Sequence, residues 1–290
     1  MSVLTEKSRV FFLILCLAFL GVSLGRAYQC IFWDIPIRSL LWNENWMASI
    51  VSLLLGLSWE EYLKHSNANS TIQGIVSTLG YILLVCAIIA TVRFRRIFTK
   101  VALYLSFLVL LFIALLYHLE KFQTAGQFFE YTLQFATPLI LWYYLKKGVT
   151  KSWILFLKIS IALTFISHGL YALGFYPVPA NFVAMTIQVL PLSQSTAIYF
   201  LLIVGILDLI FSVGLFIDGR LFDISVWYCI VWGFLTTSAR VVANIDLSMV
   251  SSTFHQWWFE SMYRLPHFLI PVLLLLIWKK QKHKLPTVPK

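Results

Sequence analysis

Hydrophobic residues fall in eight long runs along the chain, separated by short polar or basic segments. The runs are Val10–Gly25, Gln73–Val92, Val101–Leu116, Phe128–Leu145, Trp153–Tyr171, Ala197–Ile217, Ile224–Ala243 and His267–Trp278, the last of which extends back to Met262. A helix of about 20 residues, rising 1.5 Å per residue, crosses the hydrocarbon core of a bilayer. The pattern therefore predicts an all-α, polytopic membrane bundle of about eight transmembrane helices.

The first run has features of both a signal peptide and a retained span. Lys7 and Arg9 precede its apolar core, as basic residues do in a signal peptide. However, no A-x-A-like cleavage site closes the run, and a segment in the second half of the chain resembles it. We therefore expect the run to be retained as the first transmembrane helix.

Three segments between the runs are rich in aromatic residues but too polar or too short to cross a bilayer. They are Trp42–Lys64, Asn181–Ser195 and Phe254–Tyr263. Trp and Tyr prefer the level of the lipid head groups, so helices lying in the membrane interface are one interpretation. Ordinary amphipathic loops are the other, and the sequence does not choose between them.

Composition agrees with a membrane protein, because 60% of the residues are hydrophobic and only 12% are charged. Soluble domains carry roughly 25% charged residues. The net charge of +10 comes mostly from short basic clusters between apolar runs, which membrane orientation explains without nucleic acid. The four cysteines form no C-x-x-C pair, which disfavours thiol–disulfide catalysis. His255, Glu260 and His267 have spacings that do not suggest a metal site.

The basic clusters also predict an orientation. The first cluster joins the second and third runs and contains Arg93, Arg95, Arg96 and Lys100. The second joins the fourth and fifth runs and contains Lys146, Lys147 and Lys151. The third follows the eighth run and contains Lys279, Lys280, Lys282 and Lys284. With eight spans, all three clusters and the N-terminus fall on one side of the membrane. Basic connections stay cytoplasmic, so we expect a plasma (inner) membrane protein with both termini in the cytoplasm.

The two halves of the chain resemble each other. The end of the first run, Gly25–Pro36, is similar to His168–Pro179 at the end of the fifth, with Tyr28 matching Tyr171. Gln134–Pro138 likewise parallels His267–Pro271. We therefore expect two parallel four-helix units, residues 1–148 and 149–290, related by an axis along the membrane normal. Chance similarity between apolar segments is the alternative.

The second half resembles the DoxX-like family of four-helix membrane proteins. Two segments carry the resemblance, which covers residues 152–245: Ala162–Gly169, ending in His-Gly, and Gly205–Phe216, with Asp208 followed by small residues. The first half departs from the pattern, with Gly25-Arg26 in place of His-Gly and no acid in its second span. The resemblance implies association with quinone-linked redox assemblies, such as thiosulfate:quinone oxidoreductases, rather than a defined reaction.

Ionisable residues inside spans are costly and mark functional sites. Arg26, His118, His168 and Arg240 each lie about 16 or 17 residues into their runs, which is roughly 24–26 Å from the cytoplasmic edge at 1.5 Å per residue. Glu130 and His267 lie at a similar level. One interpretation is an outward-facing polar pocket roofed by the loops of Tyr28 and Tyr171; the other is that these side chains simply reach the head groups.

In the pocket interpretation, His118 and His168 are the candidate catalytic residues, since histidine moves protons near neutral pH. Arg26, Tyr28, Glu130, Tyr171, Arg240 and His267 are candidate ligand-binding residues, with arginine binding an anion or a quinone oxygen. Asp208 differs, because it lies near the middle of the sixth run, out of reach of the head groups. It must be neutral, paired with another residue, or facing a wet cavity.

Three functions remain open from the sequence. The first is the membrane subunit of a redox assembly that binds a quinone or a small sulfur or organic substrate. The second is a transporter of a small solute coupled through Asp208, since coupling ions often bind at mid-depth. The third is a non-catalytic membrane scaffold or assembly factor, because no strong catalytic or nucleotide-binding motif is present.

Overall fold

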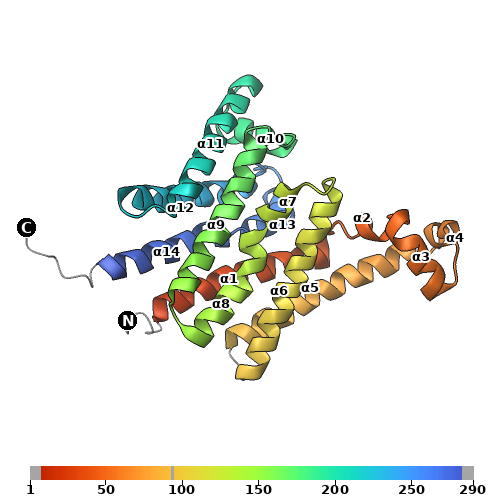
Figure 1. Ribbon diagram of the computed structural model, residues 1–290. Coiled ribbons are helices and arrows are strands. Elements are labelled where there is room, and N and C mark those ends of the chain that lie inside the picture. Colours follow the sequence, from red (N-terminus) through yellow and green to blue (C-terminus); the bar gives the residue numbers. More distant parts are fainter. Residues whose placement is uncertain (1–7, 93–94, 283–290) are drawn as a thin grey trace, which may run out of the picture.

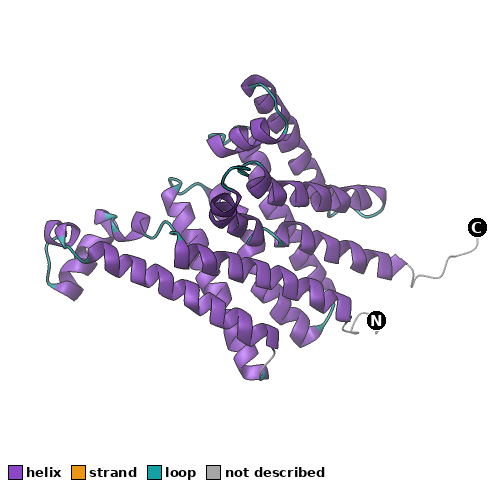
Figure 2. Cartoon of the chain, turned by 180° about the vertical axis from the view of Figure 1, so that it is seen from behind, coloured by secondary structure: helices purple, strands orange, loops and turns teal. Residues whose placement is uncertain are grey.

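The computed structural model describes residues 8–92 and 95–282, and all regular structure in these ranges is helical (Figures 1 and 2). Seven helical segments of the described residues are long and apolar enough to cross a membrane. They are α1 (Arg9–Phe32), α5 (Ala68–Val92), α6 (Arg96–Glu120), α9 (Lys151–Ala172), α11 (Gln194–Gly214), α12 (Arg220–Val242) and the joined pair α13 (Val250–Met262) and α14 (Pro266–Lys282). The protein is thus an all-α integral membrane protein.

The predicted fourth span is broken. It forms α7 (Ala125–Glu130) and α8 (Thr132–Lys147), which meet at Tyr131, and neither reaches the length of the seven long segments. A tertiary contact accompanies the break, because the amide of Leu133 donates a hydrogen bond to Thr164 Oγ1 of α9 at 3.1 Å. A second break separates α13 from α14, where Tyr263, Arg264 and Leu265 form a turn ahead of Pro266.

The three aromatic segments between spans contain helices. Trp42–Lys64 includes α3 (Glu44–Leu55) and α4 (Trp59–Lys64), which follow the short α2 (Arg38–Leu41) and extend away from the bundle (Figure 1). Ser58 and Glu61 form a capping box that begins α4. Asn181–Ser195 includes most of α10 (Ala180–Val189), and Phe254–Tyr263 lies largely in α13.

The basic segments that follow α8 and α14 lie at the same end of the bundle as the start of α1. Tyr144, near the end of α8, donates a hydrogen bond to the carbonyl of Ser8 at 2.9 Å. At the end of α14, Lys280 lies 6.0 Å from the Phe11 ring of α1, and Lys282 pairs with Asp223 of α12 at 2.9 Å. The described members of the clusters after α8 and α14 therefore share one end, as the alternation of spans predicts. Lys7, Arg93 and Lys284 lie outside the described residues.

The long helices pack as a closed ring. In chain order, α1 packs on α5, α5 on α6, α6 on α8 and α8 on α9; then α9 packs on α11, α11 on α12, α12 on α14 and α14 on α1. The helices next to the two breaks contact the opposite half of the chain: α7 packs on α9, and α13 packs on α1. A buried core that includes Phe19, Ile140, Trp153, Phe222 and Ile270 joins residues of both halves.

Small residues allow the closest helix crossings. A Cβ on Gly169 of α9 would lie 2.9 Å from the Gly205 carbonyl oxygen and 2.9 Å from the Asp208 Cβ of α11. A Cβ on Gly25 of α1 would lie 2.8 Å from the Phe259 carbonyl oxygen of α13. These are distances at which backbones touch, as in other membrane helix pairs with small residues at the interface. They bring the neighbouring side chains Arg26 and His168 into the centre of the bundle.

Candidate functional site

Arg26 lies almost fully buried at the centre of the bundle, with 1% of its surface exposed. Its Nε and Nη2 atoms donate to Gln134 Oε1 of α8 at 3.0 and 2.7 Å, and Nη1 donates to Gln29 Oε1 at 2.6 Å. The guanidinium carbon also lies 3.7, 5.0 and 5.3 Å from the ring centres of Tyr263, Tyr131 and Tyr117. Its charge is thus held by amide oxygens and aromatic faces, without a carboxylate among the described residues within ion-pair distance.

Beside Arg26, the break between α13 and α14 supplies a second group of charges. Arg264 is buried at this break, and its Nη1 lies 3.1 Å from Glu260 Oε2. Arg240 enters from α12, and its Nη1 lies 3.7 Å from the same oxygen. Two guanidinium groups therefore share one carboxylate. Arg240 makes no hydrogen bond through its side chain to any part of the chain that the structure describes.

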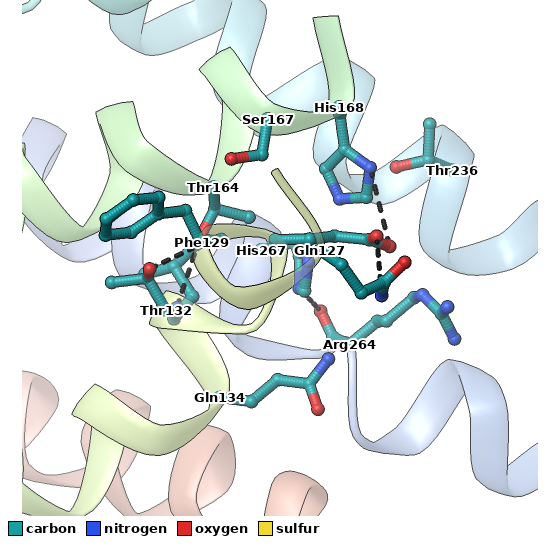
Figure 3. Close-up of polar contacts among 12 residues, drawn as sticks. Gln127, Phe129, Thr132, Gln134, Thr164, Ser167, His168, Thr236, Arg264 and His267 are labelled. Atoms are coloured by element: carbon teal, nitrogen blue, oxygen red, sulfur yellow. Dashed lines mark hydrogen bonds and ion pairs between the residues drawn. The ribbon is translucent and has the colours of Figure 1, made fainter. Parts of the chain in front are cut away.

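The other broken helix supplies a carboxylate and an amide. Glu130 ends α7, where its Oε1 lies 3.8 Å from His168 Nδ1 of α9 and its Oε2 accepts a hydrogen bond from Gln127 Nε2 at 3.2 Å. The rings of His168 and His267 lie 5.7 Å apart. Figure 3 shows Gln127, His168 and His267 converging from α7, α9 and the start of α14.

His267 has one satisfied and one unsatisfied ring nitrogen. Its Nδ1 lies 2.9 Å from the Arg264 carbonyl oxygen and therefore carries the proton when the ring is neutral. Its Nε2 is buried and has no hydrogen-bond partner among the described residues. A buried polar atom without a partner costs about 1–3 kcal/mol, so this nitrogen is placed to meet a ligand or a water.

A pocket of about 390 Å³ opens onto these groups from the second half of the chain. Its polar end is formed by His168, Arg240, Arg264 and His267. The remainder is largely apolar and is lined by residues of α9, α10, α11 and α12, including Phe182, Met185, Leu201, Val204 and Trp232. The pocket therefore has a charged end and an apolar body.

Asp208 lies on the wall of the same pocket, away from the arginines. It is buried, and its Oδ1 accepts a hydrogen bond from Tyr228 of α12 at 2.8 Å. Within residues 8–92 and 95–282, Asp208 makes no ion pair. The sequence requires Asp208 to be neutral, paired with another residue or facing a cavity. In the described chain it has a hydrogen-bond partner and faces a cavity, but no cation pairs with it.

Only some of the candidate residues predicted from the sequence lie together in the structure. Arg26, Glu130, His168, Arg240 and His267 meet at the centre. Other candidates lie elsewhere.

His118 lies at the end of α6, where its Nδ1 lies 3.0 Å from the Thr124 carbonyl oxygen. Tyr28 bonds His255 Nδ1 and packs on Trp258 in an aromatic cluster near α13, and Tyr171 bonds Thr124 Oγ1 at 2.8 Å. These three lie outside the lining of the pocket.

Several residues of the site were missing from the sequence-based set. Arg264 and Gln134 contact the buried charges directly, and Glu260 was considered only as a metal ligand. The spacing of Glu260 and Arg264 by four residues was a usable signal, because such a pair lies on one helix face. Over the described residues, no group of three His, Cys, Asp or Glu side chains is placed to hold a metal ion.

No family model, curated protein or solved structure matches the chain.

Proposed function

We propose that this membrane protein binds a lipid-soluble amphiphile in the pocket between α9, α10, α11, α12 and α14. The observation that carries the proposal is the unpartnered His267 Nε2 at the charged end of an otherwise apolar pocket. Arg240 adds guanidinium donors that form no hydrogen bond within the described chain. A head group with a hydroxyl would satisfy both, because the hydroxyl donates to His267 Nε2 and its oxygen accepts from Arg240, while the apolar tail would lie against Met185, Leu201 and Val204.

The size of the pocket supports a small-molecule ligand. Ligand sites for small molecules occupy about 300–1,000 Å³ and combine apolar walls with a few placed polar groups. A cavity of about 390 Å³ falls in this range. It suits a compact ring or part of a hydrocarbon chain, rather than a whole two-chain phospholipid.

A quinone is one amphiphile of this form, and it connects the pocket with the DoxX-like resemblance of residues 152–245. Its carbonyl oxygens would accept hydrogen bonds from Arg240, and the hydroxyl of its reduced quinol form would donate to His267 Nε2. In that case the protein acts as the membrane subunit of a quinone-linked assembly, and a partner supplies the electrons. Quinone extracted with the purified protein, and quinone-dependent turnover with such a partner, are the results that this form of the proposal expects.

We also infer the tandem repeat and the orientation. Each helix pairing in the first half has a counterpart in the second: α1 with α5 corresponds to α9 with α11, and α6 with α8 to α12 with α14. The contacts between the two halves correspond as well. The broken helix α7 of the first half packs on α9, the first long helix of the second half, and α13 of the second half packs on α1, the first helix of the first half. The shared basic end supports a plasma-membrane protein with both termini in the cytoplasm.

The test of ligand binding compares two alanine-to-phenylalanine variants. Ala239 lines the pocket, whereas Ala184 is exposed on α10 and lies outside the lining. Native mass spectrometry of the purified wild-type protein should show a bound small molecule that persists in Ala184→Phe and disappears in Ala239→Phe. If all three proteins carry the same bound mass, or none, the pocket is not the binding site. A stable protein partner without any ligand would favour a scaffold.

Transport is a second candidate, favoured by the position of Asp208 on the pocket wall. A buried carboxyl group beside a cavity is a place where a coupling proton binds in transporters. Asp208→Asn keeps the shape and removes the exchangeable carboxyl proton, so it should abolish coupled uptake in proteoliposomes. Unchanged flux through Asp208→Asn removes this candidate and leaves ligand binding untouched.

A further inference from the structure

The charges at the polar end of the pocket do not balance. Arg240 and Arg264 lie 3.7 and 3.1 Å from the same Glu260 oxygen, so two guanidinium groups face one carboxylate. Both arginines line the pocket and are 6% exposed. Arg264 also donates to the Glu260 carbonyl oxygen at 3.1 Å, whereas the Arg240 side chain forms no hydrogen bond among the described residues. Within the described chain, the side-chain hydrogen bonds of Arg264 come from Nη1, whereas all the donors of Arg240 are unused.

The surrounding buried charges do not remove this excess. Arg26 contributes a further positive charge, and Glu130 a negative one, so these five groups sum to one positive charge when the histidines and Asp208 are neutral. Asp208 faces the pocket from α11, but no cation of the described chain pairs with it, and it bonds the hydroxyl of Tyr228. Burying an unbalanced charge is costly, so a site of this composition is most stable when an anion completes it.

We propose that the amphiphile of this pocket carries a single anionic head group, a carboxylate or a phosphate monoester, bound by Arg240. This inference rests on the proposed ligand binding and specifies the class of ligand. The planar guanidinium group of arginine matches two oxygens of such a head group through paired hydrogen bonds. His267 Nε2 lies at the same end, where it accepts a hydrogen bond from the hydroxyl of a phosphate monoanion or from a water beside a carboxylate. The apolar tail extends along α10 and α11 toward Trp232.

Trp232 provides an optical probe, because it lines the pocket and bromine atoms on a bound chain quench tryptophan fluorescence at short range. The protein in nanodiscs of zwitterionic phosphatidylcholine is titrated with dibrominated stearate and with the matching dibrominated stearyl alcohol. The Trp232→Phe variant defines the quenching that comes from the other tryptophans. The carboxylate should bind at least about 10-fold more tightly than the alcohol, the scale of one charge-assisted hydrogen-bonded contact.

Arginine variants then show which residue causes the preference for the carboxylate over the alcohol. Arg240→Gln should bring the carboxylate and the alcohol to similar affinities, and Arg240→Lys should keep part of the difference. Arg220→Gln is the matched control, because Arg220 is exposed at the opposite end of the same helix. Dodecyl phosphate and dodecanoate, used as competitors, distinguish the two anionic head groups. The comparison of carboxylate with alcohol in the wild-type protein needs the Trp232→Phe reference but none of the arginine variants.

Two results overturn the inference in distinguishable ways. Equal affinity for the carboxylate and the alcohol, or tighter binding of a short-chain quinone than of either anion, would show a site that does not require charge, although the proposed ligand binding would survive. An absence of Trp232-dependent quenching by every probe would remove the anionic ligand and the proposed ligand binding together.

Discussion

The guanidinium carbon of Arg26 lies 3.7 Å from the centre of the Tyr263 ring, so the first helix of the chain is attached to the break between α13 and α14. The same guanidinium donates to Gln134, just beyond the break between α7 and α8. One side chain therefore contacts the regions of both breaks. Glu130, Glu260 and Arg264 lie at or next to these breaks in the centre of the bundle. Arg26 contacts residues that flank both breaks and therefore stabilises this arrangement.

Replacement of Arg26 by glutamine should therefore destabilise the whole bundle. The change removes charge-assisted hydrogen bonds to Gln134 and Gln29 and the stacking on Tyr263, each worth about 1–3 kcal/mol when buried. We expect a clear fall in melting temperature in detergent, together with loss of the wild-type ligand. The control is Arg9→Gln, since Arg9 is exposed at the start of the same helix. Equal melting temperatures of the two variants would contradict the role of Arg26.

Gly169→Ala tests the close crossing of α9 and α11. The added Cβ meets the Gly205 carbonyl oxygen and the Asp208 Cβ, both 2.9 Å away, so the helices must separate. Overpacking of this kind costs about 1–3 kcal/mol. Gly74→Ala on α5 is the control, because nothing lies within 4 Å of its added Cβ. Thermal unfolding should show a loss for the first variant alone; equal stability would mean that the crossing is looser than described.

Glu260→Gln leaves two buried arginines without their shared carboxylate. Removing one partner from a buried charge group costs about 3–5 kcal/mol, so this variant should be among the least stable. Glu44→Gln is the control, because Glu44 is exposed on α3. An anionic amphiphile that binds at Arg240 should restore part of the lost melting temperature, whereas a neutral one should not. A Glu260→Gln protein as stable as the control would contradict the charge arrangement.

The orientation of the chain is tested by labelling cysteines on intact cells. The four native cysteines are buried, so new ones at exposed Ser66 and Ser152 report their own position. Ser152 lies at the basic end beside Lys151, and Ser66 lies between α4 and α5 at the opposite end of the spans. A membrane-impermeant maleimide should label Ser66→Cys from outside and Ser152→Cys only after lysis. The reverse pattern, or equal labelling, would refute cytoplasmic termini.

Seven of the membrane helices were predictable because a bilayer requires long apolar runs, and the sequence displays these runs over the seven long segments of the described residues. The position of Arg26, His168 and Arg240 along their helices was predictable as well, since these helices are long and continuous. Depth along a helix does not determine the direction in which a side chain points, however. His118 has the same calculated depth as Arg240, yet it bonds the Thr124 carbonyl oxygen instead of entering the pocket.

The breaks in the helices were not predictable from hydrophobicity. Phe128–Leu145 has the composition of one continuous span, and its interruption at Tyr131 involves a hydrogen bond from Leu133 to Thr164 on another helix. Phe254–Tyr263 has the composition of an interfacial segment, and the turn after it carries Arg264 into the core. Tertiary contacts of this kind leave no periodic pattern, so Arg264 and Gln134 were missed.

The most direct test of the account is the position at which a photoreactive amphiphile attaches to the protein. A fatty acid with a diazirine in mid-chain is irradiated with the wild-type protein and with Ala239→Phe in nanodiscs, and the labelled peptides are mapped by mass spectrometry. The account predicts labels at pocket residues such as Met185 and Leu201 that Ala239→Phe abolishes. Labels confined to outward-facing residues such as Tyr199 and Val213, unchanged in the variant, would contradict a ligand within the bundle.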